Sequence, residues 1–325
     1  MAIVIRGFGK ALPVKKVSNN ELDPALETSD EWIRSHTGIG NRYICSEGED
    51  SVTLGIEACK NALAFSNELA KKAGRQEILP KDIDLIAVAS ITTRFKGFPS
   101  NSCLIQSALE VTNAAAYDVE AACSGFIYAL DMVSSQMIRH NWKYALVCGT
   151  EALSTIVDWT DRATCVLFGD GAGAVLLENV PEIDEQTRGL STAILGADGN
   201  GWECLQASHN DFLKMDGRVV YNFAVGKMAE LIKSVMEKEN LSIDDVDYFV
   251  CHQANERILL AAAKRLGYPI EKFVFNIESY GNTSSATIPI TLADMQADGR
   301  LVEGKKIIIA GFGAGLTWGA SLIRY

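Results

Sequence analysis

Short apolar runs of strand length alternate with longer amphipathic stretches along this chain. The apolar runs include residues 85–89, 114–119, 144–149 and 306–311. Between such runs the apolar residues recur every three to four positions, which is the period of a helix with one buried face. This alternation is typical of an α/β protein, and we expect a largely parallel sheet.

The order of these elements occurs twice. Residues 81–88 and 243–250 both read as an acidic turn that leads into a buried strand. The runs 144–149 and 306–311 both end in glycine, and each precedes a glycine-rich stretch that reads as a hairpin: 168–177 in the first case and 311–320 in the second.

This repetition predicts an internal duplication with two halves, residues 1–178 and 179–325, joined near 179–190. Corresponding strand ends of the two halves are then expected to meet at a central cleft, where the active sites of α/β proteins gather. Alternating elements are common to all α/β chains, so the repeat alone leaves an unduplicated α/β chain open.

Cys123 is the first candidate for chemistry. It follows the strand-like run 114–119 and precedes a stretch in which Phe126, Leu130, Val133 and Met137 have helical spacing. This places the thiol in the first turn of a helix, whose unpaired N–H groups favour the thiolate and lower the pKa of a cysteine. A buried core cysteine is the alternative interpretation.

Composition narrows the function classes. The chain has 325 residues, 48% of them hydrophobic, and a net charge of −11, which argues against nucleic acid as a partner. The apolar runs are far shorter than the roughly 20 residues of a membrane span, and residues 1–6 read as a strand rather than a signal peptide. We therefore expect a cytoplasmic protein that has no membrane partner.

The eight cysteines are scattered, with no C-x-x-C pair. This usage is typical of a reducing compartment and predicts neither a disulfide framework nor a metal site.

Two further polar side chains follow strand-like or turn-like segments. His252 comes directly after residues 248–251, and Asn282 lies in the segment 279–286. Each has a plain structural interpretation, because a single histidine is most often a structural residue and Gly-Asn is most often a turn. Their distance from Cys123 in sequence is compatible with three segments that converge on one site.

Taken together, these segments resemble the thiolase superfamily and, within it, the β-ketoacyl-(acyl carrier protein) synthase III enzymes. The resemblance covers essentially the whole chain. Its motifs are residues 28–33, 37–39, 98–100, 161–162, 168–173, 252–255, 281–284 and 312–319. It implies a thiolase-like fold in which two duplicated α/β halves pack as α-β-α-β-α layers.

The resemblance also implies the chemistry. Cys123 takes a primer acyl group from coenzyme A by nucleophilic attack, and the backbone N–H groups of Cys123 and Ala314 form the oxyanion hole. Malonyl carrier protein then loses CO2, while His252 and Asn282 donate hydrogen bonds to the developing enolate. Neither a metal nor any other cofactor is implied; acyl-coenzyme A is a substrate.

The coenzyme A site implied by the family departs from its usual pattern. Trp32 matches the residue that stacks on adenine, and Arg162 matches the residue on the opposite side. His36 stands where many relatives have an arginine, so Arg34 is the candidate replacement, and Arg218 stands in place of an asparagine at the substrate mouth. The further substrate-contact candidates are Phe98, Ala254 and Phe312.

Two protein partners are implied. Arg257, Lys264 and Arg265 match the face that docks the acidic acyl carrier protein, and their spacing brings them to one side of a helix; a solvated helix face is the alternative. Phe98 matches a residue that crosses a dimer interface to cap the partner's acyl pocket, so a homodimer is expected, with core packing beside Pro99 as the alternative.

The leading hypothesis is therefore an initiating condensing enzyme of fatty acid synthesis. Three alternatives stay open: a related condensing enzyme of quinolone or polyketide type, a cysteine thioester hydrolase, and a catalytically silent carrier-protein binder. The primer acyl group is not determined by the sequence, since one methylene changes binding by only about 1–3 kcal/mol.

Overall fold

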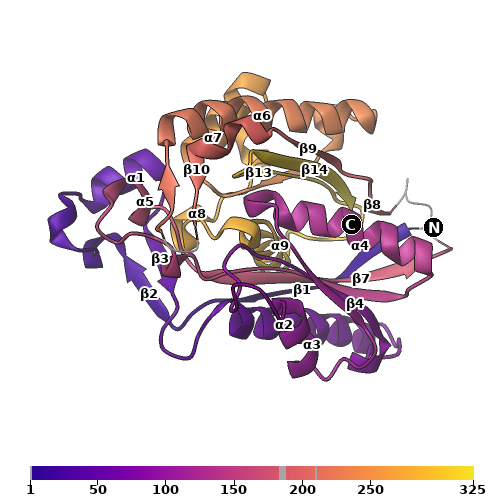
Figure 1. Ribbon diagram of the computed structural model, residues 1–325. Coiled ribbons are helices and arrows are strands. Elements are labelled where there is room, and N and C mark those ends of the chain that lie inside the picture. Colours follow the sequence, from indigo (N-terminus) through magenta and orange to yellow (C-terminus); the bar gives the residue numbers. More distant parts are fainter. Residues whose placement is uncertain (1, 183–187, 209–210) are drawn as a thin grey trace.

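The computed structural model describes residues 2–182, 188–208 and 211–325. Its elements stack in five layers, with two sheets separated by a pair of central helices and covered on their outer faces by further helices (Figure 1). The indigo to magenta half of the chain builds the lower sheet in this view, and the orange to yellow half builds the upper one.

The lower sheet has five strands in the order β1-β7-β6-β4-β5. Its strands are β1 (Ala2–Ala11), β7 (Gly171–Val180), β6 (Tyr144–Glu151), β4 (Ile83–Ala89) and β5 (Ala115–Val119). Strands β6, β4 and β5 run parallel, whereas β7 is antiparallel to both of its neighbours.

The upper sheet repeats this arrangement. Its strands are β12 (Tyr248–Cys251), β13 (Lys306–Gly313), β14 (Thr317–Arg324), β8 (Gly189–Leu190) and β9 (Ile194–Ala197). Strand β12 is parallel to β13, β13 is antiparallel to β14, and β14 is antiparallel to β8 and β9. The parallel pair followed by an antiparallel return is thus common to both sheets.

Nine α-helices lie in the described ranges. They are α1 (Asp30–Thr37), α2 (Ser51–Lys72), α3 (Asn101–Ala108), α4 (Gly125–His140), α5 (Arg162–Cys165), α6 (Gly217–Lys238), α7 (Glu256–Leu266), α8 (Ile277–Tyr280) and α9 (Thr287–Ala297). Two short ribbons complete the strands: β2 (Lys15–Ser18) with β3 (Asn41–Ile44), and β10 (Leu205–Gln206) with β11 (Lys214–Met215). In this part of the chain no helix is long and apolar enough to cross a membrane.

The outer helix α2 shows how the layers fit. Its start is capped by the carboxylate of Asp50, which accepts hydrogen bonds from the N–H groups of Val52 and Thr53. Strand β1 carries glycine where α2 crosses it: a Cβ atom on Gly7 would lie 2.1 Å from the carbonyl oxygen of Ala62. The absence of a side chain there lets the helix backbone rest on the strand.

The central helix α9 is apolar on nearly every side because sheets lie above and below it. In α9 the buried residues are Thr287, Ile288, Pro289, Ile290, Thr291, Leu292, Ala293 and Met295. A helix that is apolar all round has to be buried, and α9 contacts both β1 and β7. This core fixes the start of α9.

Three details differ from the sequence-based expectations. The sheets are mixed rather than largely parallel, since β7, β1 and β14 run against their neighbours. Residues 168–177 do not form a hairpin, because they contain only part of the single strand β7, which pairs with the more distant β6. Residues 311–320 do form a hairpin, between β13 and β14. Strand β7 ends at Val180, so the boundary at residue 178 falls inside it.

Candidate active site

One cavity of about 400 Å³ brings together residues from both halves of the chain. Its walls include Cys123, His252 and Asn282. Cys123 lies more than a hundred positions before the other two in the sequence. The sequence-predicted substrate residues Trp32, Arg162, Ala254 and Phe312 line the same cavity. The strand ends of the two sheets therefore do converge on one site.

Cys123 lies in a tight turn at the inner end of this cavity. The turn is a 3-10 helix, Ala122–Ser124, between β5 and the start of α4 at Gly125. The sequence predicted that Cys123 lies in the first turn of the helix, but in the structure it precedes α4. Ala122 has a φ of 45°, a left-handed conformation that is uncommon for alanine and is typical of strained turns at functional sites.

The electrostatics of Cys123 oppose the expected thiolate. Burial raises the pKa of its thiol to about 12, the nearby Ser284 hydroxyl lowers it, and the buried Glu151 carboxyl raises it. Only 8% of the residue is exposed. The loss of hydration outweighs the helix-terminus effect on which the sequence argument relied, so the resting side chain is a neutral thiol.

His252 follows β12 directly, and its backbone N–H donates to the Ala310 carbonyl of β13 at 2.8 Å. The ring is buried, with Nδ1 2.7 Å from the Thr287 hydroxyl and with the Phe312 ring edge-on at 5.5 Å between centroids. Burial lowers the pKa of His252 to about 3, so the imidazole is neutral at physiological pH.

Asn282 lies in a loop whose backbone is hydrogen-bonded to the segment 167–169. Its N–H donates to the Leu167 carbonyl at 2.8 Å, and its carbonyl accepts from the Gly169 N–H at 3.0 Å. The preceding Gly281 has a φ of 67°, and a Cβ atom there would lie 2.9 Å from the Leu167 oxygen, so only glycine fits. Asn282 forms an isolated parallel β-bridge with Phe168, and its side chain lines the cavity.

Two backbone segments meet at the nucleophile. A Cβ atom on Gly313 would lie 2.6 Å from the backbone nitrogen of Cys123, so the end of β13 passes directly against the cysteine. Ala314 is the next residue after this contact. The two N–H groups predicted to form an oxyanion hole, those of Cys123 and Ala314, therefore belong to neighbouring stretches of backbone.

The mouth of the cavity carries an aromatic and cationic cluster. The Arg162 guanidinium lies 5.3 Å from the centre of the Trp32 ring, and the His36 ring stacks on Trp32 with centroids 4.3 Å apart. Arg34 does not line the cavity; it pairs with Asp30 at 2.8 Å and with Glu278 at 2.7 Å. His36, which replaces the arginine of many relatives, therefore lies closer to the substrate path than Arg34.

The remaining predicted residues are on the surface. Arg257 lines the cavity mouth, and Lys264 and Arg265 lie further along the same helix, α7; all three are exposed. Within the described residues none of them forms an ion pair within 4.0 Å. Phe98 is 91% exposed, which rules out the alternative of core packing beside Pro99.

Sequence reasoning missed two buried groups that border the site. Thr287 contacts the His252 ring, and Glu151 is fully buried at the end of β6. Glu151 accepts hydrogen bonds from Thr92 at 2.6 Å and Ser285 at 2.8 Å, and burial raises the pKa of its carboxyl. A glutamate inside an apolar strand run was the available signal for this group.

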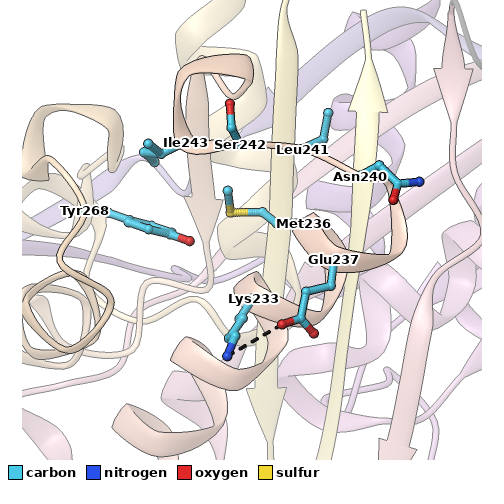
Figure 2. Close-up of a pocket in the computed structure, with 8 residues that line it drawn as sticks. All are labelled: Lys233, Met236, Glu237, Asn240, Leu241, Ser242, Ile243 and Tyr268. Carbon is cyan, nitrogen blue, oxygen red and sulfur yellow. Dashed lines mark ion pairs between the residues drawn. The ribbon is translucent and has the colours of Figure 1, made fainter.

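A second hollow lies on the outer surface near the end of α6 (Figure 2). Its walls are Lys233, Met236, Glu237, Asn240, Leu241, Ser242, Ile243 and Tyr268, and Lys233 pairs with Glu237 at 3.5 Å. None of the sequence-predicted residues lies there. In the described ranges no group of three or more His, Cys, Asp or Glu side chains is placed to hold a metal ion.

Comparison with known families bears directly on this site. Residues 117–210 match the model of 3-oxoacyl-[acyl-carrier-protein (ACP)] synthase III, and residues 236–325 match that of its C-terminal region. A β-ketoacyl-[acyl-carrier-protein] synthase III of Oceanobacillus iheyensis is 44% identical over 325 residues, covering 100% of this chain and 99% of the relative. The chain belongs to the 3-oxoacyl-(acyl carrier protein) synthase III family.

Solved structures agree with this membership. The 3-oxoacyl-[acyl-carrier-protein] synthase III of Aquifex aeolicus is 40% identical and superimposes with a TM-score of 0.92, covering 99% of this chain and 100% of that one. The priming β-ketosynthase of the R1128 polyketide pathway is 31% identical with a TM-score of 0.89, covering 99% and 95%. The predicted thiolase-like fold is confirmed.

The synthase is an acyltransferase of the condensing class that initiates fatty acid synthesis, and the leading hypothesis is confirmed ahead of its alternatives. The names of these relatives include the acyl carrier protein.

Proposed function

We propose that Cys123, His252 and Asn282 are the catalytic residues of this synthase and that each has one role in a two-step condensation. The observation that carries the proposal is that a single cavity joins the three side chains from three distant segments. The substrates are an acyl-coenzyme A primer and malonyl carrier protein.

In the first step the sulfur of Cys123 attacks the thioester carbonyl of the primer. The carbonyl oxygen becomes an oxyanion next to the N–H groups of Cys123 and Ala314, which stabilise it. The carbon–sulfur bond to coenzyme A then breaks, and the leaving thiolate takes up the proton that the cysteine has lost. The products are acyl-Cys123 and free coenzyme A.

In the second step malonyl carrier protein occupies the vacated part of the cavity and loses CO2. The electrons of the broken carbon–carbon bond form an enolate, and hydrogen bonds from His252 and Asn282 stabilise its oxygen. The enolate carbon attacks the acyl-cysteine carbonyl, the carbon–sulfur bond to Cys123 breaks, and the leaving thiolate takes up a proton from solvent. Both steps are redox-neutral, so we propose that no cofactor takes part.

Coenzyme A is proposed to enter through the cluster of Trp32 and Arg162. Two groups stacked on both faces of an adenine stand about 7 Å apart, twice the contact distance of carbon atoms. The Arg162 guanidinium is 5.3 Å from the Trp32 ring, so we expect Arg162 to move outward when the base inserts. His36 extends the stacking surface on Trp32, and Arg218 is exposed next to Gly217, which lines the cavity.

We further propose that the synthase is a cytoplasmic homodimer whose Phe98 reaches into the partner. Phe98 is 91% exposed, so a large apolar ring faces water. Covering this ring with the surface of a second copy is favourable, because it removes apolar area from water. The carrier protein is proposed to dock on Arg257, Lys264 and Arg265, which are exposed cations on α7 of an otherwise acidic protein, with Arg257 at the cavity mouth.

Product analysis tests the proposed function. The native synthase, incubated with acyl-coenzyme A and malonyl carrier protein, is expected to give a β-ketoacyl carrier protein and one CO2 for each product. A free fatty acid in place of the ketoacyl product would indicate a hydrolase, for which Asn282 has no role. Absence of turnover with any primer would contradict the proposal as a whole.

A further inference from the structure

The hydroxyl of Thr287 is within hydrogen-bond distance of two groups, one of which is the His252 ring. The Thr287 Oγ1 is 2.7 Å from Nδ1 of His252 and 3.0 Å from the carbonyl oxygen of Ser284. A threonine hydroxyl has a single proton, so it donates to only one of these two acceptors. The choice determines which nitrogen of the imidazole carries the hydrogen.

The distances favour donation to the histidine. O–H donors typically make bonds of about 2.7–2.8 Å, whereas N–H donors typically make bonds of about 2.9–3.0 Å. The 2.7 Å contact between the Thr287 hydroxyl and Nδ1 has the length of a bond from an O–H donor. The 3.0 Å contact between the same hydroxyl and the Ser284 carbonyl is longer than O–H donors typically make. That carbonyl also already accepts the backbone N–H of Thr287, so it is satisfied without the hydroxyl.

Burial leaves the imidazole with one proton. His252 is 1% exposed and Thr287 is 3% exposed, so water does not compete for either group. Burial also lowers the pKa of His252, and a neutral ring has one N–H and one lone pair. If the lone pair on Nδ1 accepts the Thr287 proton, the N–H is on Nε2.

We propose that Thr287 is a positioning residue that donates its hydroxyl hydrogen to Nδ1 of His252 and thereby holds the ring as the Nε2–H tautomer. Its value to the synthase rests on the proposed function, in which His252 donates a hydrogen bond to the enolate oxygen. The opposite tautomer would present a bare lone pair to that oxygen and would repel it.

The same short segment orients both donors of the second step. The Oδ1 of Asn282 accepts from the Ser284 N–H at 2.8 Å, and Thr287 comes three residues after Ser284, at the first position of α9. Because the core on both sides of α9 fixes this start, the segment 282–287 is a rigid support for the two side chains. The first step, which uses the Cys123 sulfur and backbone N–H groups, does not depend on it.

The tautomer is measured directly by nitrogen NMR of the synthase labelled with 15N-histidine, because protonated and unprotonated ring nitrogens have well separated shifts. The chain has four histidines, and the His252 signals are assigned by their loss in His252→Gln. We expect the Nε2–H form in the native protein and in Thr287→Ser. We expect Thr287→Val to show the Nδ1–H form or a mixture.

Activity supplies the second readout. Thr287→Val is expected to slow condensation by about 10- to 100-fold, less than the loss of a whole oxyanion donor, and to leave acylation of Cys123 within about 3-fold of native. Thr291→Val is the matched control, because the Thr291 hydroxyl is also buried in α9 but donates to the Thr287 carbonyl at 2.8 Å, away from the ring.

A native protein with the proton on Nδ1 would overturn the proposal, as would an unchanged tautomer and unchanged condensation in a folded Thr287→Val. The NMR result is obtained without substrate. Failure of the native enzyme to form a ketoacyl product would therefore contradict the proposed function while leaving the tautomer assignment to be judged by its own spectrum.

Discussion

The backbone N–H of Ser284 donates a hydrogen bond of 2.8 Å to Oδ1 of Asn282. This bond occupies the acceptor end of the carboxamide and leaves its NH2 group as the part that faces the cavity. The arrangement suits an asparagine that donates to an anion, and it explains why a neutral side chain with two distinct ends is required here.

Asn282→Asp tests this role with almost no change in shape. The carboxylate retains an acceptor for Ser284 but offers no hydrogen to an enolate, so condensation is expected to fall by about 100-fold or more. Acylation of Cys123 by acyl-coenzyme A is expected to persist. Stopped assays of coenzyme A release and of CO2 release separate the two steps, and equal losses in both would contradict a role specific to decarboxylation.

Glu151→Gln tests the charge state of the buried carboxyl. Its pKa is raised by burial above the value of about 4.3 in the unfolded chain, so between these two values the folded state binds one proton more than the unfolded state. The free energy of unfolding therefore falls as pH rises through that window, and glutamine removes this loss.

The variant is expected to match native stability near pH 4 and to exceed it above the raised pKa, by about 1.4 kcal/mol for each unit of pKa elevation. Urea unfolding at several pH values measures the difference. A gap between native protein and variant that does not change with pH would mean that the pKa of the carboxyl is the same in the folded and unfolded states.

Arg257→Glu tests carrier-protein docking at the cavity mouth. Reversing an exposed charge at a docking face lowers the association rate, so the Michaelis constant for malonyl carrier protein is expected to rise several-fold, with the effect shrinking in high salt. Acylation from coenzyme A is expected to change little. Lys71→Glu, on α2 in the opposite outer layer, is the control and is expected to behave as native.

Phe98→Ser tests the dimer. If the exposed ring is buried against a second copy, its loss weakens association and opens the acyl pocket, so light scattering is expected to show a lower mass at micromolar concentration together with lower condensing activity. Ile270→Ser is the control, because the native Ile270 is also an exposed apolar residue, at 41%. A native protein that is monomeric at this concentration would contradict the interface.

The sequence was informative where a short motif coincides with a strand end. Strand β12 ends at Cys251 as the pattern predicted, whereas Asn282 pairs with Phe168 in an isolated β-bridge that the pattern did not predict. Resemblance then joined these positions to Cys123. Local patterning could not do so, because convergence of the three segments depends on how the two sheets pack.

What the sequence could not supply is the balance of long-range effects. A helix-terminus argument favoured a thiolate at Cys123, but burial raises the pKa of that thiol to about 12. Arg34 was a reasonable substitute for the missing arginine, yet ion pairs with Asp30 and Glu278 engage it. Thr287 carries no motif of its own, and its relation to His252 exists only in the folded chain.

Intact-protein mass spectrometry after incubation with acyl-coenzyme A thioesters tests the central claim most directly. The native synthase is expected to gain the mass of one acyl group, and Cys123→Ala is expected to gain none. Cys165→Ala, which removes another buried cysteine, is expected to acylate as native does. An acyl adduct of unchanged extent on Cys123→Ala would contradict the assignment of the nucleophile and, with it, the proposed mechanism.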